Sequence, residues 1–390
     1  MPIAASAQRA RTDASEPAVR MAKIPSLDGL RATSIVLVLA GHTIKAGPHS
    51  FGFRALLLHA DLGVRVFFII SGFLITSLLL NERSKSGSIS LRQFYIRRAL
   101  RILPAFFLFV GCVALLSNFG VIPIPDWFWL YVLTYTVNFA QRSPWVLYHL
   151  WTLSVEEQFY LLWPLVMKIA RPRTWAAVAI LAIAASPAVH ALHRFLGVRL
   201  AFYAFPFVCG PIAMGCLLAI GAPRVRQVIV SSKVLSHGWI LLLTLLSIAL
   251  LDAIPSEWGA PTVFLGIVTN SLLTLCVARL VFSPAGVSGR ILNSAPAVLI
   301  GKLSYSLYLW QQLFLNPNSS APISTPFPVN LVATLAAASV CYWGLEVRFL
   351  KARMKFHKLA QPVASAQPYP KRRHIPGRTP LPGRDVGEVV

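Results

Sequence analysis

The sequence predicts an all-α, polytopic membrane protein with about ten transmembrane helices around a polar lumen. Three observations predict this class. The 390 residues are 56% hydrophobic and only 13% charged, with a mean hydropathy of +0.65, whereas about a quarter of the residues of a soluble domain are charged. Apolar runs of spanning length recur along the chain. Lys and Arg gather in alternate connecting segments, as the positive-inside rule requires.

The chain begins with residues 1–25, which are polar and basic and lack the apolar core of a signal peptide, so we expect a cytoplasmic arm. The first two spans are expected at about 27–46 and 61–80, and a polar loop, 81–98, follows them. The remaining spans are expected near 99–117, 146–169, 175–190, 201–220, 237–252, 261–281, 296–315 and 328–348.

The net charge of +23 would suit a protein that binds nucleic acid. Most of the 36 basic residues, however, lie where the helices are expected to meet the cytoplasm. There they fix topology and contact anionic headgroups, so we expect membrane lipid as a partner and no nucleic acid. An even number of helices gives a transmembrane domain over 26–350 with both termini cytoplasmic. The Pro- and Gly-rich basic tail, 351–390, is expected to be disordered.

Two further features add neither a span nor a metal site. Segment 119–145 carries Trp127, Trp129 and Trp145 among prolines, which is typical of an outer loop or a short interfacial or re-entrant helix rather than a full crossing. The five cysteines lie inside apolar runs without paired or metal-like spacing. We therefore expect them to pack in the interior, and we expect no metal.

The first span carries two ionisable side chains, Arg31 and His42, eleven residues apart. Eleven residues are three helical turns plus about 20°, so both side chains lie on one face, about 16 Å apart along the axis. Ionisable groups at membrane depth are costly, and they usually face a cavity, a pathway or each other. This face of the helix is therefore expected to line the polar lumen.

On the fourth span, His149, Glu156 and Tyr160 share one stripe, and Glu157 points about 100° away. Glu156 is expected at a depth similar to that of His42. A histidine beside a carboxylate suits general-base chemistry, because the carboxylate fixes the tautomer and stabilises the imidazolium. The alternative is structural: His42 bonds a backbone carbonyl and Glu156 pairs with Arg31. The spacing leaves both open.

Arg98 and Arg101 are three residues apart and share a face at the cytoplasmic end of the third span. Guanidinium groups in that arrangement suit phosphate oxygens, as in a nucleotide or a coenzyme pyrophosphate. Arginines beside a membrane more often only set topology, and the spacing alone favours that interpretation.

The chain resembles the acyltransferase-3 family of integral membrane acyltransferases over about residues 24–350. The family signatures are an arginine, ten residues and a histidine on the first helix, and paired arginines on the third. The matching stretches are Leu27–Arg31 with His42, Gly63–Phe73, Phe94–Pro104, His149–Tyr160 and Ser304–Trp310. One departure is Gln311, where many members carry a histidine, and it argues against proton transfer at that position.

The resemblance implies a ten-helix enzyme of the cell inner membrane that takes an acyl group from an acyl-CoA, usually acetyl-CoA, at the cytoplasmic face. His42 would be the catalytic base or a transient acyl carrier, and Glu156 would assist it. The coenzyme phosphates would lie on Arg31, Arg98 and Arg101. The acceptor would be a hydroxyl, usually of a carbohydrate.

The acceptor and the acyl group are open at this point. Some relatives carry a hydrolase-like domain after the last helix, whereas this sequence continues for about 40 residues, so the acceptor is expected to reach the membrane domain itself. An exopolysaccharide, a lipopolysaccharide or a lipid-linked glycan would suit, and a succinyl donor is an alternative to acetyl. The competing hypothesis is a polytopic transporter of acyl groups or glycans without chemistry of its own.

Overall fold

The computed structural model describes residues 25–43, 60–196, 205–232, 260–284, 286–315 and 326–352, with scattered residues between 235 and 250. Within these ranges every regular element is a helix and no strand occurs, which confirms the all-α class. The predicted arm up to residue 24, the tail from 353 and most of the predicted span 237–252 lie outside the described residues.

Except for the polar α12 (Ala222–Ser231), the longer helices follow the apolar runs of the sequence. They are α2 (Pro25–Thr43), α4 (Ala60–Ser86), α5 (Leu91–Asn118), α8 (Leu150–Ile169), α9 (Pro172–Leu196), α11 (Gly210–Ile220), α12, α15 (Ala260–Phe282), α17 (Ala295–Phe314) and α18 (Val329–Cys341). Side-chain caps fix two of the starts. At the start of α5 the Ser90 hydroxyl accepts from the backbone N–H of Gln93. At the start of α17 the Ser294 hydroxyl accepts from that of Ala297. Both bonds satisfy amides that have no partner inside the helix.

The predicted count of about ten transmembrane helices is not supported. By length and composition, the described residues contain five helices able to cross a membrane, or six if the pair α11 and α12, bent by 81°, forms one span. The helices that fall short are long enough, because α2, α8 and α17 have 19, 20 and 20 residues. They are too polar to qualify, since they carry side chains such as Arg31, Glu156 and Gln311. These three helices also contribute residues to the candidate site described below.

The predicted polar loop 81–98 is wrong. Helix α4 continues to Ser86 and α5 begins at Leu91, so the connection between them is only four residues long. Polar side chains stabilise these helix ends beyond the apolar core. The Glu82 carboxylate accepts from the Ser90 backbone N–H at 2.8 Å and pairs with Arg97 at 2.9 Å. Charged residues of good helix propensity therefore extend both helices instead of breaking them.

Segment 119–145 contains short helices only. These are α6 (Phe128–Leu133), the 3₁₀ turn η1 (Val137–Phe139) and the start of α7 (Trp145–Tyr148), each too short to cross a membrane. The segment packs back on the helices, because Phe128, Val132 and Val137 belong to the same buried cluster as Phe106 and Phe109 of α5. The prediction of a segment that does not make a full crossing is confirmed.

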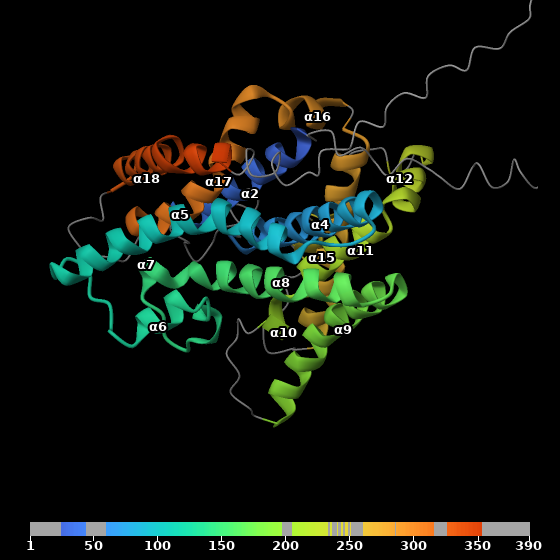
Figure 1. Ribbon diagram of the computed structural model, residues 1–390, viewed down its shortest axis with the longest axis horizontal. Helices are drawn as coiled ribbons and strands as arrows, with labels where there is room; N and C mark the ends of the chain where they lie inside the picture. Colours follow the sequence, from blue (N-terminus) through green and yellow to red (C-terminus); the bar gives the residue numbers. More distant parts are fainter. Residues whose placement is uncertain are drawn as a thin grey trace, which may run out of the picture.

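Close helix approaches at glycines hold the bundle together. A Cβ atom added at Gly301 of α17 would lie 1.9 Å from the Asp28 carbonyl oxygen of α2, and one at Gly215 of α11 would lie 2.1 Å from the Ile69 carbonyl oxygen of α4. Small residues allow such contacts between membrane helices. Figure 1 shows α4 between the pair α2 and α17 and the long α8, which extends alongside it.

Candidate functional site

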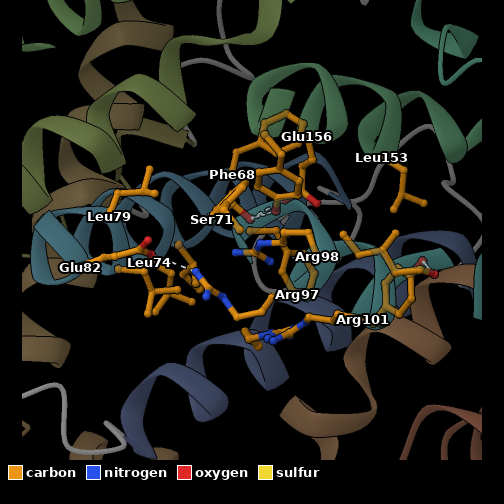
Figure 2. Close-up of a pocket in the computed structure, with 18 of the residues that line it drawn as sticks. Phe68, Ser71, Leu74, Leu79, Glu82, Arg97, Arg98, Arg101, Leu153 and Glu156 are labelled. Carbon is orange, nitrogen blue, oxygen red and sulfur yellow. Dashed lines mark hydrogen bonds and ion pairs between the residues drawn. The ribbon is translucent and has the colours of Figure 1, made fainter. Parts of the chain in front are cut away.

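A cavity of about 730 Å³ opens among the helices α2, α4, α5, α8 and α17. Its charged lining residues are five cations and two carboxylates, all from α2, α4, α5 and α8: Arg31, Lys85, Arg97, Arg98, Arg101, Glu82 and Glu156. Aromatic and aliphatic side chains, among them Phe68 and Leu74, form the rest of the wall together with uncharged polar residues such as Ser71 (Figure 2). The cavity is large enough for a ligand of the size of a nucleotide.

Among the described residues, Arg97 alone of the five cations forms a direct ion pair. Of the other four, Lys85 is exposed, whereas Arg31, Arg98 and Arg101 are partly buried. In the described part of the chain, no carboxylate lies within ion-pair distance of Arg31, Arg98 or Arg101. The Arg98 guanidinium instead lies over aromatic faces, with its Cζ atom 4.6 Å from the Tyr160 ring centre and 5.9 Å from that of Phe94. Guanidinium groups that are partly removed from water and have no carboxylate partner favour an anionic ligand.

Arg97 differs from its neighbour Arg98 although both line the cavity. Its Nη2 atom lies 2.9 Å from the Glu82 carboxylate, and the two side chains are only 23% and 20% exposed. The guanidinium also donates to Gln93 at 3.4 Å. Figure 2 shows Arg97 directed toward Glu82, while Arg98 lies beside Ser71 and Glu156. The positive charge of Arg97 is therefore already balanced.

Glu156 forms a short hydrogen-bond chain on the cavity wall. The Ser71 hydroxyl donates to the Glu156 carboxylate at 2.5 Å, and the Tyr160 hydroxyl donates to Ser71 at 3.1 Å. Because the Tyr160 ring also lies under Arg98, the chain connects the carboxylate of α8 to the arginine of α5 through α4. Ser71 is a site residue that the sequence analysis did not single out, although it lies inside the Gly63–Phe73 stretch.

His42 is not among the residues that line this cavity. Its Nδ1 atom lies 2.7 Å from Oε1 of Gln311 on α17, and its ring packs edge-on against Trp145 of α7, with centroids 5.6 Å apart and planes at 88°. An amide oxygen can only accept a hydrogen bond, so Nδ1 carries the proton and Nε2 has a free lone pair.

The next residue of α17 holds a second histidine. Oε1 of Gln312 accepts from the backbone N–H of His149 at 2.9 Å and lies 3.0 Å from its Nδ1. One turn earlier, the Tyr308 hydroxyl bonds the His149 carbonyl oxygen at 3.1 Å and the Thr152 hydroxyl at 2.6 Å. Tyr308 and Thr152 both line the cavity. Polar groups of α17 thus connect the cavity wall to the region of the two histidines.

The structure brings together four of the five predicted site residues. Arg31, Arg98, Arg101 and Glu156 face one cavity, whereas His42 lies outside its lining and contacts Gln311. The hydrogen bonds of Glu156 go to Ser71 rather than to His42. Of the purely structural alternative, one half is present, because His42 also bonds the backbone of Val38. The other half is not, because Glu156 and Arg31 form no direct ion pair among the described residues. In the described residues no three His, Cys, Asp or Glu side chains are placed to hold a metal ion.

Comparison with known proteins gives a consistent result. A family model described as "Acyltransferase domain" matches residues 24–346. The chain is similar to O-acetyltransferase OatA of Staphylococcus aureus strain NCTC 8325 / PS 47, with 29% identity over 367 residues, which cover 85% of this chain and 58% of OatA. OatA of strain MRSA252 gives the same values. The chain therefore spans less than two thirds of the length of these curated relatives. No solved structure matches the chain significantly.

Proposed function

The chain belongs to the acyltransferase family whose domain model covers residues 24–346, and on this premise we propose that it transfers an acetyl group from acetyl-CoA to a hydroxyl of a carbohydrate. The O-acetyltransferase relatives favour acetyl as the group transferred. The acceptor class we propose is a glycan that reaches the membrane, such as an exopolysaccharide, a lipopolysaccharide or a lipid-linked saccharide.

The observation that carries the proposal is a set of three partly buried arginines that form no direct ion pair among the described residues. Arg31, Arg98 and Arg101 come from two helices and line one cavity of about 730 Å³. Placing cations in a partly dehydrated site without partners is costly, and an anionic ligand offsets that cost. A coenzyme that carries several phosphate groups meets this requirement better than a neutral glycan. We therefore assign the cavity to the acyl donor.

In the proposed reaction His42 is the general base. Its Nε2 atom takes the proton from the acceptor hydroxyl, and the oxygen attacks the thioester carbonyl carbon. The carbon–sulfur bond then breaks, and the proton passes to the departing thiolate, so the products are an acetyl ester and coenzyme A. Arg31 and His42 are about 16 Å apart along α2, a separation that the pantetheine arm of the coenzyme can span.

In this proposal Glu156 belongs to the donor cavity. Its carboxylate bonds Ser71 and lies on the same wall as Arg98 and Tyr160. We assign it the task of holding this wall in place, together with a balancing negative charge. The same proposal places the enzyme in the cell inner membrane with both termini in the cytoplasm, because acetyl-CoA is a cytoplasmic donor and the positive-inside rule assigns the basic segments of the sequence to that side.

The test is acetyl transfer by the purified protein in liposomes, using acetyl-CoA labelled in the acetyl group and a surface glycan as acceptor. We expect His42→Ala to abolish transfer, and Arg98→Ala to lower it strongly at donor concentrations below KM, while both proteins stay folded and inserted. Arg92→Ala is the matched control, because Arg92 lies on the same helix, is exposed and does not line the cavity.

Two outcomes would contradict the proposal. Transfer of label by His42→Ala protein at the wild-type rate would show that His42 is not the general base. Movement of glycan or acyl groups across the liposome membrane without any ester formation would instead support the transporter hypothesis. Incubation with labelled donor and no acceptor separates two routes within the enzyme hypothesis, because only an acyl-histidine route leaves label on the protein.

A further inference from the structure

The side chain of Gln311 has one hydrogen-bond partner among the described residues, and that partner is His42. Gln311 is 0% exposed, and its Nε2 atom is buried without a hydrogen-bond partner in the described structure. Burying an amide whose oxygen is hydrogen-bonded but whose NH₂ group is not costs free energy of folding. A glutamine that merely joined two helices would be expected to pair both ends, so the contact with His42 is the feature that needs an explanation.

We propose that Gln311 is a positioning residue for His42, which holds the proton on Nδ1 and leaves Nε2 as the basic nitrogen. This inference rests on the proposed function, because it assigns Gln311 a task in the step that His42 performs. The bond length of 2.7 Å and the full burial of the amide make the contact specific. The wrong tautomer would place a hydrogen on Nε2, and such a histidine could not accept the proton of the acceptor hydroxyl.

The ring of His42 is held from a second direction as well. Trp145 packs edge-on against it, with the planes at 88°. Since Trp145 belongs to α7 and Gln311 to α17, contacts from two different elements fix the imidazole. The amide sets which nitrogen carries the proton, and the indole sets the plane of the ring. Nε2 lies on the side of the ring opposite to the glutamine.

The packing of α17 against α2 places Gln311 at the level of His42. Near the start of both helices the Ser26 hydroxyl donates to the Asn293 side-chain oxygen at 3.1 Å. Further along, Gly301 lies directly against the Asp28 backbone. The two helices therefore lie parallel, and their contacts continue from Asn293 through Gly301 to Gln311. The position of the amide relative to His42 is set by backbone packing.

Gln312 provides the matched comparison. It is 1% exposed and adjacent in sequence, but its Oε1 atom bonds both the backbone N–H and the ring of His149, at the beginning of α8. Its bonds thus anchor a helix start. Truncation of either glutamine removes a buried amide of the same size from the same helix. Only the truncation of Gln311 removes the partner of His42.

The experiment compares Gln311→Leu, Gln311→Glu and Gln312→Leu in the liposome assay, with kcat, KM for acetyl-CoA and the pH dependence of kcat as readouts. We expect Gln311→Leu to lower kcat at least about 100-fold with KM for the donor changed less than about threefold. Gln311→Glu still accepts from Nδ1, so it should recover most of kcat. Its negative charge stabilises the imidazolium, so the acidic limb of the profile should shift to higher pH. Gln312→Leu should change thermal stability more than the pH profile.

Two results would overturn the inference. The first is a Gln311→Leu protein that keeps kcat within about threefold while His42→Ala is inactive, since the proposed function would then stand without this role for Gln311. The second is an equal fall of kcat in Gln311→Leu and Gln311→Glu with no shift in the pH dependence of kcat. That result would indicate that Gln311 has a purely structural role. Failure of the proposed function itself is recognised separately, by full activity in His42→Ala.

Discussion

The Arg98 guanidinium lies over the face of Tyr160, with Cζ 4.6 Å from the ring centre. The hydroxyl of the same tyrosine donates to Ser71, which in turn donates to Glu156. The arginine that we propose to bind the anionic donor thus lies against a ring and forms no direct ion pair among the described residues. This arrangement keeps its charge available at the cavity wall.

The ring of Tyr160 should therefore contribute to donor binding independently of its hydroxyl. We expect Tyr160→Leu to weaken coenzyme A binding about fivefold, because a cation–π contact of about 1 kcal/mol is lost and Arg98 is no longer fixed. Tyr160→Phe keeps the ring and should weaken binding less than about threefold. The measurement is isothermal titration of coenzyme A into the purified protein. An effect of Tyr160→Phe as large as that of Tyr160→Leu would assign the contribution to the hydroxyl instead.

The adjacent residues Arg97 and Arg98 should behave differently, because only Arg97 has a carboxylate partner. We expect Arg98→Ala to raise KM for acetyl-CoA at least tenfold, since charge-assisted bonds to phosphate contribute about 1.5–3 kcal/mol. Arg97→Ala should change KM less than about threefold and should instead lower the melting temperature, because Glu82 is left without its partner. Equal effects of the two substitutions on KM would show that the Glu82 pair opens when the donor binds.

Glu156→Gln distinguishes a role in the donor cavity from direct assistance to His42. The carboxylate shares the cavity with the three arginines, so its removal strengthens the attraction for phosphate groups. We expect KM for acetyl-CoA to fall about threefold, with an increased dependence on salt. Assistance to His42 would instead lower kcat and leave KM and its salt dependence unchanged. Steady-state kinetics at two ionic strengths make this comparison.

The helix positions of the site could be predicted because they depend on local periodicity. Arg31 on α2, Arg98 and Arg101 on α5 and Glu156 on α8 were each placed by spacing within a single helix, and the structure assembles all four at one cavity. Contacts between helices could not be predicted in this way. The bond between His42 and Gln311 joins residues 269 positions apart, and no pattern within either helix encodes it.

The polarity of the site also explains why three predicted spans do not qualify by hydropathy. A helix that lines a polar interior needs apolar residues only on its outer face, so α2, α8 and α17 fall below the hydropathy of a membrane span while remaining long enough to cross. The adjacent amides Gln311 and Gln312 near the end of α17 were a signal for the site. Buried polar side chains within a predicted span either join neighbouring helices or line a functional site.

The close approach of α17 to α2 at Gly301 gives a test of whether packing sets the geometry of the site. A methyl group at this position would lie 1.9 Å from the Asp28 carbonyl oxygen. Backbone atoms cannot rotate away, so Gly301→Ala must separate the two helices, and the separation shifts Gln311 relative to His42. We expect a stability loss of about 1–3 kcal/mol together with a fall in kcat of at least tenfold.

Gly111→Ala on α5 is the control, because a methyl group there meets no atom within 4 Å, and helix propensity alone should make it neutral or slightly stabilising. Thermal unfolding in detergent and kcat in liposomes measure the two effects. Wild-type kcat in a destabilised Gly301→Ala protein would show that His42 is positioned independently of the packing between α2 and α17.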